Sequence, residues 1–198
     1  MTPPASVASP GLAALHEAAA AVGLTVSSSA CWPETDADVE VTPLAGFIES
    51  NFSPLVAEVA GRALRGRAQP HASGKVTAIV IVTALGDVTS AARVAAAVDA
   101  GRRVPPLLFF QSVPNAVAGY LAARWHLTGP VVCVSGTSAG LDMAALLIDD
   151  ADADEALVVS VDLAAAGGGR DRAAAIVVTG PADLDDRKPH EPLGGRKR

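Results

Sequence analysis

A serine framed by two glycines follows a short apolar segment in the second half of the chain. Residues 136–140 have the sequence GTSAG and come directly after the segment 131–135, VVCVS. This is the pattern G-x-S-x-G, in which a sharp strand-to-helix turn exposes the serine hydroxyl. A hydroxyl in such a turn attacks an ester or thioester carbonyl once a neighbouring base takes its proton. The spacing therefore indicates acyl chemistry, with Ser138 as the candidate nucleophile.

Such a serine needs a histidine and an acid, and in α/β-hydrolases both follow the serine in the chain. Asp142 and several further aspartates follow Ser138, but the one downstream histidine is His190, in a charged terminal stretch. No upstream segment matches the glycine-rich oxyanion loop of lipases. A serine hydrolase or thioesterase that uses Ser138 is therefore the alternative interpretation, not the first.

Apolar runs and helix signals predict the elements that hold this turn in place. Strands are expected at 24–29, 76–83, 131–135, 156–161 and 173–179, and helices at 9–22, 54–64, 88–100, 114–126 and 138–148. The segment 76–83 is apolar at nearly every position, so we expect it in the centre of the sheet. A glycine turn near residue 168 is too short for a crossover helix, which makes the last two strands antiparallel neighbours. These elements predict an α/β fold, a mixed sheet of about five strands with helices on its faces.

Composition limits the class of protein. The chain has 198 residues, of which 50% are hydrophobic and 4% aromatic, so we expect one domain with a core of Ala, Val and Leu. The net charge of -6 argues against nucleic acid as a partner. Two cysteines and four histidines predict neither a disulfide framework nor a zinc site, and no metal or cofactor is expected. No apolar run reaches the ~20 residues of a membrane span and no signal peptide is seen, so we expect a soluble, cytoplasmic protein.

A longer pattern around the turn carries a resemblance. The pair Pro114-Asn115 opens a predicted helix, Gly129-Pro130 ends it, and the apolar strand and the glycine turn follow. This order resembles the segment of β-ketoacyl synthases that leads to the active-site strand, and it implies a thiolase-like half-fold. The resemblance divides the chain into an N-terminal helix (1–23), a ketosynthase-like N-terminal domain (24–180) and a charged tail (181–198), which we expect to be disordered.

The family's catalytic residues are not matched in this chain. Thr137 stands where the family has its nucleophilic cysteine, and Cys133 lies four residues earlier, inside the strand. A threonine hydroxyl is a poor nucleophile without an activating base. The family's two histidines come from its C-terminal half, before which this chain ends, and His16, His71 and His126 match neither. The resemblance therefore implies a non-catalytic relative: a chain-length factor, or one of the short ketosynthase-like proteins of aryl-polyene and type II polyketide systems.

The resemblance also implies where this protein contacts other molecules. Asn115 and residues of the turn would face an acyl group, and the strand before the turn would be the interface with a second subunit. Five arginines would either meet an acidic carrier or be solvated surface. The expected partners are a full-length β-ketoacyl synthase and an acyl carrier protein. A half-fold also leaves apolar surface where the second half would pack. The residues are Asn115, Gly136, Thr137, Ser138 and Gly140 for the acyl group, Val131, Val132, Cys133, Val134 and Ser135 for the second subunit, and Arg62, Arg65, Arg67, Arg102 and Arg103 for the carrier.

Overall fold

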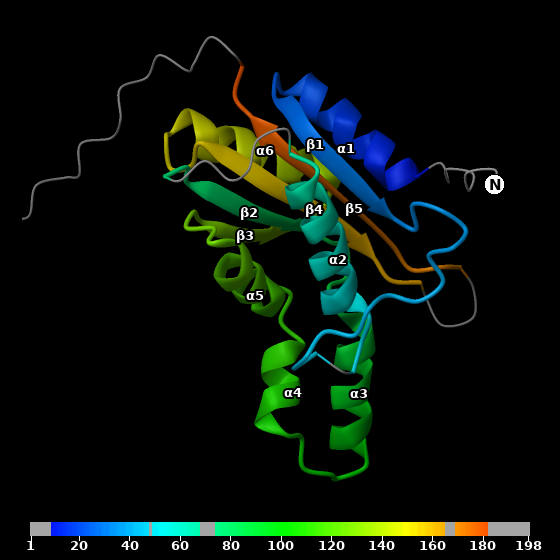
Figure 1. The fold of residues 1–198 in the computed structure, drawn as a ribbon. Coiled ribbons are helices and arrows are strands. Elements are labelled where there is room, and N and C mark those ends of the chain that lie inside the picture. Colours follow the sequence, from blue (N-terminus) through cyan, green and yellow to red (C-terminus); the bar gives the residue numbers. More distant parts are fainter. Residues whose placement is uncertain (1–8, 48, 68–73, 165–168, 182–198) are drawn as a thin grey trace, which may run out of the picture.

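One mixed β-sheet forms the centre of the molecule (Figure 1). The computed structural model describes residues 9–47, 49–67, 74–164 and 169–181. The strands are β1 (Thr25–Trp32), β2 (Thr77–Val82), β3 (Val131–Val134), β4 (Glu155–Asp162) and β5 (Arg172–Thr179). Their order across the sheet is β1-β5-β4-β2-β3. β2 is parallel to β3 and β4, whereas β5 is antiparallel to β4 and β1.

Helices cover both faces of this sheet. They are α1 (Pro10–Ala21), α2 (Phe52–Arg65), α3 (Val88–Asp99), α4 (Pro106–Gln111), α5 (Asn115–Trp125) and α6 (Thr137–Asp149). α1 and α6 pack on one face, and α2 and α5 pack on the other. α3 and α4 form a hairpin that stands out beyond the end of the sheet (Figure 1). None of the described helices combines the length and apolarity needed to cross a bilayer.

β2 shows why five of its six residues are apolar. Ile79 and Ile81 point into the core beneath α2 and α5, while Ala78 and Val80 point into the core beneath α6. A strand buried on both faces favours apolar side chains, and the one polar residue of β2, Thr77, donates a buried hydrogen bond to Glu155 (2.7 Å). β2 is nevertheless the fourth strand of five, and β4 occupies the centre, so the central position predicted for the segment 76–83 was wrong.

The closing antiparallel pair is confirmed, because β4 and β5 pair in register from Glu155↔Thr179 to Asp162↔Arg172. β3 departs from the prediction of a buried strand. It lies at the edge of the sheet, where Val131 is 40% exposed and the next three residues are half-buried.

α4 lies between the predicted helices 88–100 and 114–126, where no helix is expected. Proline is well suited to the first position of a helix, where its missing N–H has no intrahelical partner, and α4 begins at Pro106. β1 likewise runs on to Trp32, beyond the predicted 24–29, because pairing with β5 extends it.

The N-terminal helix covers one end of the sheet. α1 begins after Ser9, whose Oγ accepts a hydrogen bond from the Leu12 N–H (3.4 Å), and Gly23 follows its end with a φ of 75°. Leu15 and Ala19 are fully buried in a core that β5 shares. α1 and α6 together cover this face of the sheet within the chain. The apolar surface expected of a half-fold stays a prediction. The predicted tail, apart from Pro181, lies outside the described residues.

Candidate functional site

The turn between β3 and α6 has the strand-turn-helix geometry expected from its sequence. β3 ends at Val134, and Gly136 then adopts a φ of 91°, a left-handed conformation that favours glycine. α6 begins at Thr137 without a side-chain cap, and its first backbone bond runs from the Gly140 N–H to the Gly136 carbonyl (3.1 Å). The N–H groups of the first turn thus lack intrahelical partners and carry the positive end of the helix dipole.

Gly140 fixes the distance between α6 and the sheet. A Cβ at this position would lie 2.4 Å from Cγ2 of Val82 on β2, closer than two carbon atoms can pack. Gly140 is buried, Thr137 is half-buried and Ser138 is exposed. The second glycine of the motif therefore permits close packing, whereas the first permits the turn.

Within the described part of the chain, neither the Thr137 nor the Ser138 hydroxyl has a base as a hydrogen-bond partner. No described hydrogen bond joins Thr137 or Ser138 to a histidine or a carboxylate. His126 ends α5 with a φ of 55° and precedes β3, so the length of that strand, about 13 Å, separates it from the turn. Asp142 is exposed one turn further along α6, and His71 and His190 lie outside the described residues. The geometry alone supplies neither hydroxyl with an activating partner.

Cys133 sits within β3 and packs against the core beneath α2 and α5. Burial raises the pKa of its thiol. A thiol that stays protonated near neutral pH is a weak nucleophile, because the thiolate is the reactive form. Cys133 therefore has the environment of a packing residue.

Asn115 opens α5 and is exposed. No described side-chain hydrogen bond joins Asn115 to the glycine turn, and its role in acyl contact stays a prediction. The five predicted strand residues are placed together: Val131 to Val134 make up β3, and Ser135 is exposed directly after it.

Two of the five arginines predicted to meet a carrier are already paired within the chain. Arg62 donates to Asp38 (2.9 Å) and Glu58 (2.8 Å) and lies over the ring of Trp32, 5.0 Å from its centroid. The hydrogen bond from Arg62 holds the pKa of the Asp38 carboxyl well below its usual range.

Arg67 forms a buried ion pair with Glu155 (3.0 Å). Burial lowers the pKa of its guanidinium. Arg65, Arg102 and Arg103 are exposed, so they are the members of the predicted set that a partner can reach.

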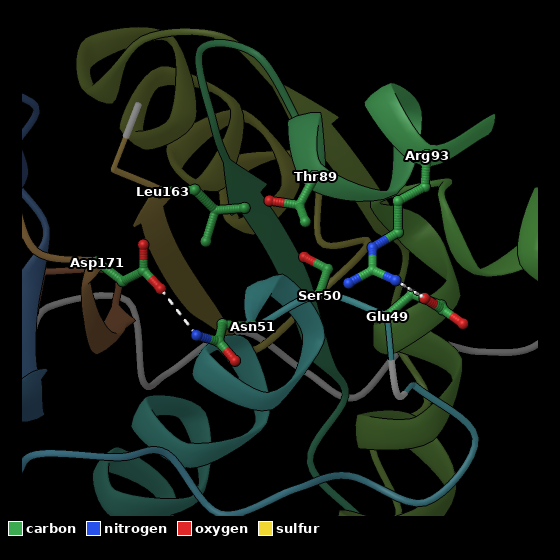
Figure 2. A pocket seen from close by; sticks show the side chains of 7 residues that line it. All are labelled: Glu49, Ser50, Asn51, Thr89, Arg93, Leu163 and Asp171. Carbon is green, nitrogen blue, oxygen red and sulfur yellow. Dashed lines mark hydrogen bonds and ion pairs between the residues drawn. The ribbon is translucent and has the colours of Figure 1, made fainter. Parts of the chain in front are cut away.

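A polar cavity of about 330 Å³, which sequence reasoning missed, lies where β4 ends and α3 begins (Figure 2). Its lining comes from four segments, namely Glu49, Ser50, Asn51, Thr89, Arg93, Leu163 and Asp171. Asn51 donates to Asp171 (3.0 Å), and Arg93 pairs with Glu49. Asp171 also accepts the Ala164 N–H (2.9 Å). The two carboxylates that line the cavity, Glu49 and Asp171, therefore already accept hydrogen bonds from neighbouring groups. The one available signal was that ligands of open α/β sheets bind at the carboxyl ends of parallel strands.

No protein-family model matches the chain, and no curated protein matches it. Solved structures do. A ketosynthase (ApeO) in complex with its chain length factor (ApeC) from Xenorhabdus doucetiae matches with a TM-score of 0.61 and 17% identity, over 80% of this chain and 79% of that chain. The ishigamide ketosynthase/chain length factor matches with a TM-score of 0.59 and 21% identity, over 79% of this chain and 51% of that one. This chain thus spans about half the length of the ishigamide protein.

These likenesses define the fold. The chain has the α/β thiolase-like fold, with the mixed five-stranded sheet and covering helices expected from its sequence. It is ketosynthase-like in that fold, and the proteins it is similar to include ketosynthase and chain length factor complexes.

Proposed function

We propose that this chain is a chain-length-factor-like accessory subunit, which pairs with a full-length β-ketoacyl synthase in polyketide or fatty-acid-type chain elongation. The observation that carries the proposal is the match to the ApeO–ApeC complex, in which the aligned region covers nearly equal shares of the two chains, 80% and 79%. The matched chain is therefore about as long as this one. A thiolase-like chain of this length has a structural counterpart in an assembly that contains a ketosynthase.

The chemistry of the turn supports an accessory role without condensation. Thr137 occupies the position that the resemblance gives to a nucleophilic cysteine, and no described base contacts its hydroxyl. An unactivated threonine does not attack a thioester at a useful rate. The uncapped first turn of α6 still offers N–H donors to a carbonyl or an anion, so weak contact with an acyl group is part of the proposal. An acyl carrier protein would deliver that group and meet the exposed arginines.

The proposed contact with the ketosynthase is the open edge of β3. Within the described residues β3 pairs with β2, and its outer side has no strand beside it. The carbonyls of Pro130 and Val134 accept bonds from Ile79 on β2 and from Thr83 just after it. Because a parallel strand alternates its bonding direction, the N–H and C=O of Val131 and Cys133 point to the open side. An unpaired strand edge is a template for another chain.

Co-expression with each full-length β-ketoacyl synthase of the source genome in turn, to find the one that pairs with this chain, tests the proposal. We expect the two chains to co-purify in a 1:1 complex. Val131→Pro removes an outward N–H while leaving the bonds to β2, so it should weaken the complex about tenfold; Val131→Ala, which keeps that N–H, is the matched control. Separate elution of the two wild-type chains would overturn the proposal.

The alternative, a serine hydrolase, is examined with the same preparation. A fluorophosphonate probe that labels the wild-type protein, and fails to label Ser138→Ala, would establish Ser138 as an activated nucleophile. Under the proposed function neither protein is labelled.

A further inference from the structure

The polar cavity between β4 and α3 is walled by two bonded pairs of side chains. Figure 2 shows Asn51 with Asp171 toward one side of the cavity and Arg93 with Glu49 toward the other. Each pair joins segments that are distant in the chain, since Asn51 and Glu49 precede α2, Asp171 precedes β5 and Arg93 belongs to α3. The pairs hold these side chains in place, so a ligand finds much of the wall already arranged.

Both pairs keep hydrogen-bonding groups to spare. Asn51 donates one amide N–H to Asp171, which leaves its second N–H and its carbonyl oxygen without a partner within the described part of the chain. Arg93 bonds to Glu49 through one terminal nitrogen, so its Nε–H and its other terminal N–H groups are likewise available. An ionised carboxylate accepts about four bonds, and Asp171 accepts two from described groups. Each side therefore presents both donors and acceptors.

The side chains between the two pairs add hydroxyls and a small apolar contact. The Thr89 hydroxyl takes part in no hydrogen bond among the described residues. The Ser50 hydroxyl accepts the Phe52 N–H (3.1 Å) and keeps its own O–H to donate. Leu163 is the one apolar side chain in the described lining.

The charge and polarity of the lining indicate the class of ligand. Two carboxylates stand against one guanidinium, a net charge of -1 that disfavours an anion, while a cation would share the space with Arg93. An apolar molecule would displace water from polar groups without replacing its hydrogen bonds. A hydroxyl both donates and accepts, so it matches a wall that presents both kinds of group. At about 330 Å³ the cavity lies at the lower end of the ~300–1,000 Å³ of ligand pockets, so the ligand is small.

We infer that this cavity binds a small neutral polyhydroxy compound, of the size of a monosaccharide or a cyclitol. Its hydroxyls donate to Asp171 and to the Asn51 carbonyl oxygen and accept from Arg93, and its C–H groups lie against Leu163. The inference does not rest on the proposed function. The cavity lies at the end of β4, two strands away in the sheet from β3 and its glycine turn.

Saturation-transfer difference NMR on the full chain tests the inference. The method detects direct contact, whereas a melting curve does not, because polyols stabilise folded proteins by exclusion from their surface. The polyol probes are myo-inositol, D-glucose and D-ribose, and the charged probes are acetate and ethanolamine. We expect contact with at least one of the three polyols, with a Kd in the millimolar range, as befits a ligand of about a dozen non-hydrogen atoms.

Two cavity variants and one control locate the contact. Arg93→Met removes the guanidinium donors and should weaken polyol binding about tenfold or more, the loss for a hydrogen bond to a charged group. Arg124→Met, at an exposed arginine of α5, is the matched control and should bind within about twofold of wild type. Thr89→Val replaces an exposed hydroxyl by a methyl group and should weaken binding about fivefold, so it keeps the test decisive if the Arg93 variant does not fold.

Polyol contact that falls in the cavity variants and persists in Arg124→Met would support the inference. No contact with the three polyols, or equal contact in every variant, would overturn it. Stronger contact with acetate or ethanolamine, lost in Arg93→Met, would assign the cavity to a charged ligand and would equally overturn it. None of these outcomes bears on co-purification with a ketosynthase, so the proposed function is tested separately.

Discussion

Gly140→Ala tests whether close packing of α6 on β2 is what the second glycine of the turn provides. The added Cβ would meet Cγ2 of Val82 at 2.4 Å. Val82 is 3% exposed and β-branched, so its side chain has little freedom to move aside. Overpacking of this kind costs about 1–3 kcal/mol, and the rigid neighbour places the value near the upper end.

Replacing glycine by alanine within a helix returns about 1 kcal/mol in helix propensity. The net expectation for Gly140→Ala is therefore a loss of about 2 kcal/mol in the free energy of unfolding, which lowers the Tm by roughly 4–8 °C for a chain of this length.

Gly119→Ala is the matched control, because Gly119 lies in α5 and a Cβ there meets nothing within 4 Å. It should raise the free energy of unfolding by about 1 kcal/mol, so the two glycine-to-alanine variants differ by about 3 kcal/mol. Urea unfolding followed by circular dichroism measures both. Combining Gly140→Ala with Val82→Ala should be at least about 1 kcal/mol less damaging than the sum of the single losses. Equal stabilisation by both alanines would refute the argument.

Three further outcomes are expected. Gly136→Ala, at a φ of 91°, should lower the free energy of unfolding by about 1–2 kcal/mol in a thermal melt, whereas an asparagine at this position should lower it less. The pKa of Asp38 is lowered in the folded state by Arg62, so its contribution to stability is complete above the unfolded-state pKa of about 4 and is lost as the pH falls; Asp38→Asn should lower stability at pH 7 and flatten the acid side of the stability profile. Thr137→Cys places a thiol at the first turn of α6, which lowers thiol pKa values, so iodoacetamide should modify it near neutral pH faster than Cys133, whose pKa burial raises; equal rates at the two cysteines would contradict this reasoning.

The sequence predicts the elements around the glycine turn well because each has a strong local cause. Strands buried on both faces read as apolar runs, and a short glycine turn forces β4 and β5 to be antiparallel neighbours. The position of β2 beside the sheet edge was missed, because an apolar run reports burial on two faces and says nothing of how many strands lie beyond it.

The residues that the sequence did not indicate are brought together by tertiary structure. The polar cavity takes its lining from segments up to 122 positions apart, since Glu49 and Asp171 both line it. No spacing rule connects such residues before the sheet order is known. The ion pairs of Arg62 with Asp38 and of Arg67 with Glu155 were not indicated by the sequence for the same reason, because the paired residues are distant in the chain.

α1 covers the part of one face of the sheet that lies around β5. Its fully buried Leu15 and Ala19 share a core with Ile176 and Val178. A shortened protein that started at residue 24 would place that strip of isoleucine, valine and alanine in water. Bacterial overproduction of such a version should give insoluble material, whereas fusion of a tag ahead of Ser9 leaves the strip covered.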